Sequence, residues 1–224
     1  MRPRFTDRIE AGRHLASALS GYTGRADAIV LGLPRGGVPV AFEVARALGV
    51  PLDVFIVRKL GVPGQEEFAM GAIASGVARL IDAALVRDLA ISSAEIDAVA
   101  KAETRELERR ERQYRGDRAF PELTGRTVIV VDDGLATGAT MRVAVAALRG
   151  EHPARIVVAV PVAPWETCEA LRQAADDVVC AVTPEPFHAV GLWYEDFRQT
   201  TDEEVHDLLE RARHELTFPP TPRR

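Results

Sequence analysis

Short runs of β-branched apolar residues alternate with amphipathic segments along most of the chain. The runs are almost continuously apolar, which indicates strands covered on both faces and hence a parallel sheet. The segments between them predict helical crossovers, because parallel strands need a long connection across the sheet. The predicted strands are 28–33, 52–57, 127–131, 155–160 and 178–182. We therefore expect an α/β fold in which helices flank a parallel β-sheet.

Helices are predicted after three of these strands. Val40, Val44 and Leu48 recur at helical spacing and predict a helix over 38–48. A second helix is expected over about 139–149, and a third begins near Pro164, since proline suits the first turn of a helix.

Three segments lie outside this alternation. Helices are expected over 6–19 and from 201 to about 214, whereas 61–71 is too irregular to assign and is expected to border a cleft. The stretch 92–118 begins with Ser92 and Glu95 in capping-box spacing and continues with many charge pairs four residues apart. It predicts a charged helical arm, which could be solvated, cover a site or contact a second subunit. Residues 219–224 are proline-rich and expected to be disordered.

Composition narrows the class of protein. The chain has 224 residues and a net charge of −5, which argues against a dedicated nucleic-acid surface and predicts no DNA partner. No apolar run is long enough for a membrane span, and two cysteines are too few for a disulfide framework. We expect one cytoplasmic domain over 1–218 without a membrane partner. Among 28 basic residues only Lys59 and Lys101 are lysines.

The segment 128–140 carries the clearest chemistry. A buried strand ends in Asp132 and Asp133, and a loop of small residues then leads to a helix N-terminus with Thr137 and Thr140. Backbone N–H groups at a helix N-terminus suit a phosphate, and the two carboxylates can accept hydrogen bonds from sugar hydroxyls. The pattern favours a phosphorylated polyol over the alternative of an ordinary turn in which the acids merely cap a helix.

This segment resembles the phosphoribosyl-pyrophosphate (PRPP) binding motif of type I phosphoribosyltransferases, and the likeness extends over most of residues 5–213. The resemblance implies a type I phosphoribosyltransferase-like fold with a helical arm and a small hood formed by 1–20 and 184–213. It implies that Asp132 and Asp133 hold the ribose hydroxyls and that residues 137–141 wrap the 5′-phosphate. The implied PRPP-binding residues here are Asp132, Asp133, Gly134, Ala136, Thr137, Gly138, Ala139 and Thr140.

Two further segments are implied to contact pyrophosphate. One is the loop 33–37, with Arg35, Gly36 and Gly37, where the family commonly has a non-proline cis peptide, expected here around Pro34–Gly36. The other is the pair Arg58 and Lys59 at the end of the second strand. By themselves these segments would be an ordinary turn and solvated basic residues. With the acid pair, the resemblance implies that Asp132, Asp133, Arg35 and Lys59 carry catalysis.

An aromatic cluster follows the fifth strand, from Phe187 to Phe197, and could stack on a planar base or simply cover the core. It loosely resembles the hood of purine phosphoribosyltransferases, which implies base contacts from Phe187, Val190 and Trp193. The same likeness implies that Asp196, with Asp132 and Asp133, helps to hold metal. Ala136 departs from the hypoxanthine–guanine enzymes, which have an aspartate there, so a 6-oxopurine acceptor is placed in doubt.

The expected function is Mg²⁺-dependent transfer of phosphoribosyl from PRPP to a nitrogenous base, with release of pyrophosphate. The arm 92–118 is a candidate lid, with Tyr114 and Arg115 reaching toward the site, or a contact in the homodimer that is the family habit. One alternative is a non-catalytic regulator that binds PRPP or a nucleotide. Another is an unrelated phosphosugar-binding α/β enzyme.

Overall fold

Five parallel strands form the main sheet of the computed structural model, which describes residues 4–216. Their order is β2-β1-β6-β7-β8. The bounds are β1 Ala28–Gly32, β2 Leu52–Val54, β6 Thr127–Val131, β7 Arg155–Val162 and β8 Asp177–Val182. Every predicted strand is confirmed, although β2 ends at Val54, earlier than expected. Gly32 pairs with Val131, so β1 and β6 end together and their following loops meet at one edge.

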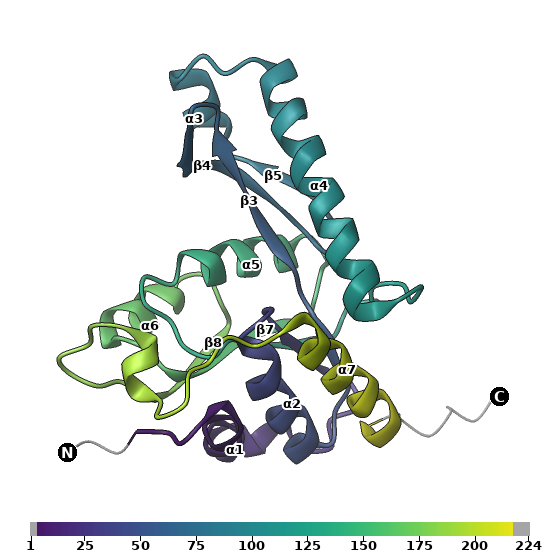
Figure 1. Ribbon diagram of the computed structural model, residues 1–224, viewed down its shortest axis with the longest axis vertical. Coiled ribbons are helices and arrows are strands. Elements are labelled where there is room, and N and C mark those ends of the chain that lie inside the picture. Colours follow the sequence, from purple (N-terminus) through teal and green to yellow (C-terminus); the bar gives the residue numbers. More distant parts are fainter. Residues whose placement is uncertain (1–3, 217–224) are drawn as a thin grey trace.

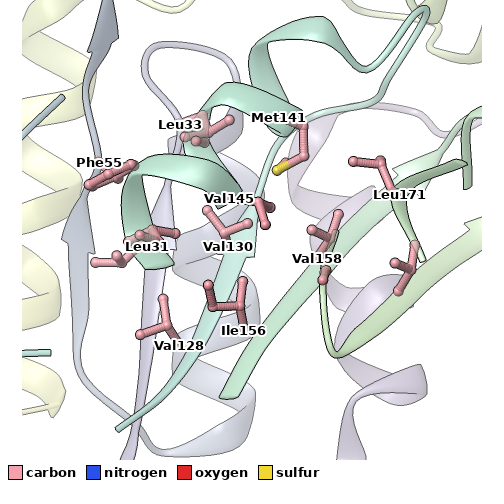
Figure 2. Packing of buried hydrophobic residues seen from close by; sticks show 14 of the residues in the cluster. Leu31, Leu33, Phe55, Val128, Val130, Met141, Val145, Ile156, Val158 and Leu171 are labelled. Atoms are coloured by element: carbon pink, nitrogen blue, oxygen red, sulfur yellow. The ribbon is translucent and has the colours of Figure 1, made fainter. Parts of the chain in front are cut away.

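Helices cover both faces of this sheet (Figure 1). They are α1 Arg8–Ala18, α2 Gly37–Leu48, α5 Ala139–Arg149, α6 Trp165–Leu171 and α7 Asp202–Leu216, with short 3₁₀ turns at Ser20–Tyr22 and Val190–Trp193. Val128 and Val130 pack with Met141 of α5 on one face, as Figure 2 shows. Ile129 and Val131 pack against α1 and α2 on the other. The alternation explains why β6 is buried at every position and apolar from Val128 to Val131.

A second, antiparallel sheet and two helices form an arm that rises from the main sheet (Figure 1). Its elements are β3 Val57–Val62, β4 Gln65–Ala74, β5 Val77–Ile81, α3 Ala83–Asp88 and α4 Ser93–Arg115. The capping box of Ser92 and Glu95 is confirmed. The stretch 61–71, to which the sequence assigned no role, lies in a hairpin of β3 and β4. Bulges in that hairpin disturb the regular alternation of side chains, which hid the strands.

The side chains at the base of α4 fix this helix to the main sheet. Tyr114 is fully buried, and the side chain of Arg115 is only 2% exposed. Arg115 binds Asp53 of β2 at 2.7 Å and also donates to the carbonyl oxygen of Val54. The expectation of reaching residues is therefore wrong for Arg115, which anchors the arm to β2, whereas the hydroxyl of Tyr114 binds Asp202, the ion-pair partner of Arg35.

Two other features complete the fold. Cys168 of α6 and Cys180 of β8 form a disulfide. Two cysteines are too few for a disulfide framework, but they link this helix to the neighbouring strand. Among the described residues, no helix has the length and apolar character needed to cross a membrane. The predicted tail 219–224 and the first three residues of the expected hood lie outside the described residues.

Candidate functional site

The acid pair lies at the centre of the sheet's carboxyl edge. Asp132 and Asp133 follow β6, which lies between β1 and β7 in the strand order. Ligands of open parallel α/β sheets bind in the crevice at this edge. The backbone N–H of Asp133 donates to Oδ1 of Asp132 at 2.9 Å. The local turn therefore keeps the two carboxyl groups side by side.

Burial and mutual repulsion disfavour the charged forms of this pair. Burial raises the pKa of Asp132 well above its ordinary value, and the neighbouring charge of Asp133 raises it further. Burial also raises the pKa of Asp133, against the opposing effect of the Arg8 guanidinium. A site that holds two acids in this way gains from any ligand that donates hydrogen bonds or brings positive charge.

A phosphate-sized cradle follows the acid pair. Gly138 caps the N-terminus of α5 with a φ of +70°, and a β-carbon there would lie 2.9 Å from Cγ2 of Thr167. Thr137 and Thr140 are exposed beside the first turn of α5, whose N–H groups have no partner within the helix. The N–H of Ala139 donates to Oγ1 of Thr137 at 3.4 Å. The hydroxyl of Thr167 donates to the carbonyl oxygen of Ala136 at 2.7 Å and holds the loop from α6.

The loop 33–37 lies directly against the acid pair. It contains a cis peptide between Pro34 and Arg35, within the expected interval. A β-carbon at Gly36 would overlap Oδ2 of Asp133, and one at Gly37 would lie 2.7 Å from the carbonyl oxygen of Val131. Only glycine permits this approach, so the two loops that sequence reasoning singled out separately form one site.

The basic pair of β3 is placed differently from the sequence expectation. Arg58 and Lys59 lie inside the antiparallel sheet of the arm, not at the end of β2. Arg58 binds Glu103 of α4 at 2.5 Å, and Lys59 is exposed. In the part of the chain that the structure describes, no hydrogen bond or ion pair joins either residue to the acid pair. The predicted position of Arg58 and Lys59, at the end of the second strand, is wrong because β2 is three residues shorter than predicted.

The aromatic segment after β8 covers the acid loop. The hydroxyl of Tyr194 donates to the carbonyl oxygen of Asp133 at 2.5 Å. Val190 also faces this loop, because a β-carbon at Gly134 would lie 2.5 Å from its Cγ1 atom. The rings of Phe187 and Trp193 stack with centroids 6.4 Å apart. Phe187 also lines an open cavity of about 650 Å³ with Pro164, Glu166, Pro184, Glu185 and Pro186.

Sequence reasoning missed Arg8, which makes the only ion pair to the acid pair among the described residues. Its Nη2 lies 2.8 Å from Oδ2 of Asp133, with the two side chains 11% and 14% exposed. The sequence carries no signal for it, because Arg8 is one of many arginines and lies 125 residues from its partner.

Comparison with known proteins decides the family. A model of the phosphoribosyl transferase domain matches residues 5–192, which include the acid pair, the cradle and the loop 33–37. The chain belongs to the phosphoribosyl transferase family. The resemblance expected from residues 128–140 is thereby confirmed, and so is the expected fold class.

Several relatives of this phosphoribosyl transferase domain are similar over most of its length. Two Mycobacterium tuberculosis proteins, each named "Putative phosphoribosyl transferase", are 47% identical over 212 residues, which is 95% of this chain and 48% of theirs. The chain thus spans about half the length of these relatives. The crystal structure of TT1426 from Thermus thermophilus is 44% identical, with a TM-score of 0.82, and the match covers 93% of this chain and 98% of that one.

The phosphoribosyl transferase domain offers few protein ligands for a metal ion. The described residues contain no group of three or more His, Cys, Asp or Glu side chains arranged for one. Asp196 pairs with Arg198 at 2.9 Å and is half exposed, and its expected metal role stays a prediction. The acid pair fits Mg²⁺ better, since that ion is commonly held by one or two carboxylates with substrate phosphates and water.

Proposed function

We propose that this domain binds PRPP with Mg²⁺ and transfers its phosphoribosyl group to a nitrogenous base, releasing pyrophosphate. One observation carries the proposal. The acid pair lies between the cradle at the start of α5 and the glycine loop 33–37, which touches Asp133. A ribose bound at the acids would then have a phosphate site on each side, as PRPP requires.

Each group in the site has a chemical role in this proposal. Asp132 and Asp133 accept hydrogen bonds from the ribose hydroxyls, and the N–H groups of the cradle with Thr137 and Thr140 bind the 5′-phosphate. The loop 33–37 brings its backbone and Arg35 to the pyrophosphate. Bound Mg²⁺ would supply positive charge to the pyrophosphate and ribose oxygens.

The reaction needs no protein nucleophile. The bond between C1 of the ribose and the pyrophosphate oxygen breaks with its electron pair on the leaving group, a C1–N bond to the acceptor forms, and the acceptor loses a proton. Positive charge develops at the ribose ring, and negative charge develops on pyrophosphate. The carboxylates and Arg35 are positioned to stabilise these charges, which is the usual source of rate enhancement in such a site.

The acceptor is proposed only as a class. Phe187, Val190 and Trp193 lie on the segment that covers the acid loop, and the stacked rings of Phe187 and Trp193 offer aromatic surface on which a planar base could pack. Ala136 is exposed and has no carboxylate to contact a ring nitrogen. The same observation favours the second candidate function, a protein that binds PRPP or a nucleotide for regulation and does not turn it over.

The decisive experiment combines binding with turnover. Calorimetry should show saturable binding of PRPP in the presence of Mg²⁺, and the ligand should raise the melting temperature. Asp132→Asn and Asp133→Asn should abolish this binding while circular dichroism shows a folded protein. Release of pyrophosphate with one member of a panel of bases would support transfer, whereas binding without release for any base would support the regulator. No binding of PRPP by the wild type would overturn transfer from PRPP, and no binding of either PRPP or nucleotides would overturn the regulator as well.

A further inference from the structure

Arg8 is placed beside the site by the start of α1. Asp7 caps this helix by accepting a hydrogen bond from the backbone N–H of Glu10, and Arg8 is the first helical residue. The preceding residues pair with the segment after β8, since Phe5 donates to the carbonyl oxygen of Trp193. Two chain segments distant in sequence therefore set the position of the Arg8 backbone.

Each of the three guanidinium nitrogens of Arg8 has a partner. Its Nε and Nη2 atoms both lie 2.8 Å from Oδ2 of Asp133, and Nη1 donates to the carbonyl oxygen of Arg198 at 2.8 Å. Its central carbon lies 4.1 Å from the ring centroid of Phe197. A planar cation with fixed donors suits these simultaneous contacts, which a lysine ammonium could not reproduce.

Both contacts to Asp133 end on the same oxygen. Oδ2 faces Arg8 and lies against Gly36, whereas the Tyr194 hydroxyl holds the backbone carbonyl of the same residue. Arg8 therefore holds the Asp133 carboxyl group, Tyr194 holds the backbone that carries it, and the absence of a side chain at Gly36 leaves room for it, all before any ligand binds. Arg8 itself leaves Oδ1 unused.

We propose that Arg8 is a positioning residue for the ribose end of the site: it holds Oδ2 of Asp133 so that Oδ1 is presented to a sugar hydroxyl. The inference rests on the proposed function, because it assigns a ribose to the acid pair. It adds a specific role for the N-terminal helix, which joins the acid loop and the segment 194–198 through one side chain. Preorganisation of this kind lowers the entropy lost when the ligand binds.

The test compares two ligands and three variants. Arg8→Met removes the charge and donors, Arg8→Lys keeps the charge, and Arg13→Met removes an exposed arginine on the same helix that pairs with Glu43 instead. Affinities for PRPP and for inorganic pyrophosphate, each with Mg²⁺, are measured by calorimetry, with melting temperatures as the check on folding. Pyrophosphate has no ribose, so it reports on the other end of the site.

Arg8→Met should weaken PRPP binding by roughly ten-fold or more, the effect of losing a charge-assisted hydrogen bond. It should leave pyrophosphate affinity within about two-fold, and Arg8→Lys should fall between it and the wild type. Arg13→Met should match the wild type. Unchanged PRPP affinity, or equal losses for both ligands, in Arg8→Met would overturn the inference. If Arg8→Met does not fold, the same comparison is decided by Arg8→Lys. Failure of the wild type to bind PRPP would instead overturn the proposed function, and the inference with it.

Discussion

The hydroxyl of Tyr114, near the end of α4, donates to Oδ1 of Asp202, the first residue of α7, at 2.6 Å. The same oxygen lies 3.8 Å from Nη1 of Arg35 in the loop 33–37. One carboxylate thus connects the base of the arm to an arginine expected to bind pyrophosphate. Tyr114 is fully buried, and burial raises the pKa of its phenol, so the hydroxyl keeps the proton that it donates to Asp202.

Tyr114→Phe removes the competitor of Arg35 for Asp202. We expect the carboxylate to hold Arg35 more strongly and pyrophosphate affinity to fall by roughly two- to five-fold, which corresponds to about one hydrogen bond. Tyr22→Phe is the matched control, because the Tyr22 hydroxyl donates to Asp177 at 3.1 Å, away from these residues. Calorimetry with pyrophosphate and Mg²⁺ measures both. If Tyr114→Phe and Tyr22→Phe change the affinity for pyrophosphate equally, the connection from Tyr114 through Asp202 to Arg35 is contradicted.

Asp132→Asn should stabilise the ligand-free protein at neutral pH. Burial and the charge of Asp133 raise the pKa of Asp132, so the folded state binds its proton more tightly than the unfolded chain does. Ionisation therefore lowers the free energy of unfolding as the pH rises through the raised pKa. The substitution removes this cost, and each kcal/mol gained raises the melting temperature by roughly 2–4 °C for a domain of this size.

The control for that variant should change the stability in the opposite direction. Hydrogen bonds from Arg25 and then Thr127 lower the pKa of Asp27 to about 2. Its ionised form therefore stabilises the fold above the ordinary aspartate pKa, and Asp27→Asn should lower the melting temperature at pH 7. Melting curves of Asp132→Asn, Asp27→Asn and the wild type are recorded in steps of about one pH unit from about pH 5 to pH 8. If the gain in melting temperature from Asp132→Asn does not grow with pH, the raised pKa of Asp132 is contradicted.

Gly138→Ala should abolish binding of the 5′-phosphate group. Its left-handed backbone strains any other residue, at a cost of about 1 kcal/mol, and the added carbon would meet Thr167. Gly49→Ala is the matched control, since Gly49 has a φ of +65° with open space around it. Both variants should lose stability, but only Gly138→Ala should lose affinity for ribose 5-phosphate in a direct titration. Retained affinity would show that the cradle is not the phosphate site.

Arg115→Met should be strongly destabilising, by about 3–5 kcal/mol, because it leaves two acids near the base of the arm without their buried partner. Those acids are Asp53 and Glu111. Arg109→Met is the control, since Arg109 is half exposed and its hydrogen-bond and ion-pair partners among residues 4–216, Glu106 and Gln113, both belong to α4. Urea denaturation should give a midpoint close to wild type for the control. A similar midpoint for Arg115→Met would contradict its role as the anchor of the arm.

Local patterns predicted most of the main sheet and its helices. Continuous apolar runs such as Val128–Val131 require burial on both faces, and that requirement is met in few ways other than a parallel sheet. The charged helix 93–115 was also predictable from its cap and its charge spacing. The β3–β4 hairpin was not, because its register shifts interrupt the alternation by which strands are identified.

The sequence by itself determined the acid pair, the cradle and the glycine loop, since each is a contiguous segment whose residue types are demanded by its backbone or its chemistry. Only the tertiary structure decided that Arg8 binds Asp133, that Tyr114 and Arg115 anchor the arm, and that Arg58 pairs with Glu103. These contacts join residues far apart along the chain. Exposed and buried arginines look alike in a sequence, and the choice between them depends on which charges the fold brings within reach.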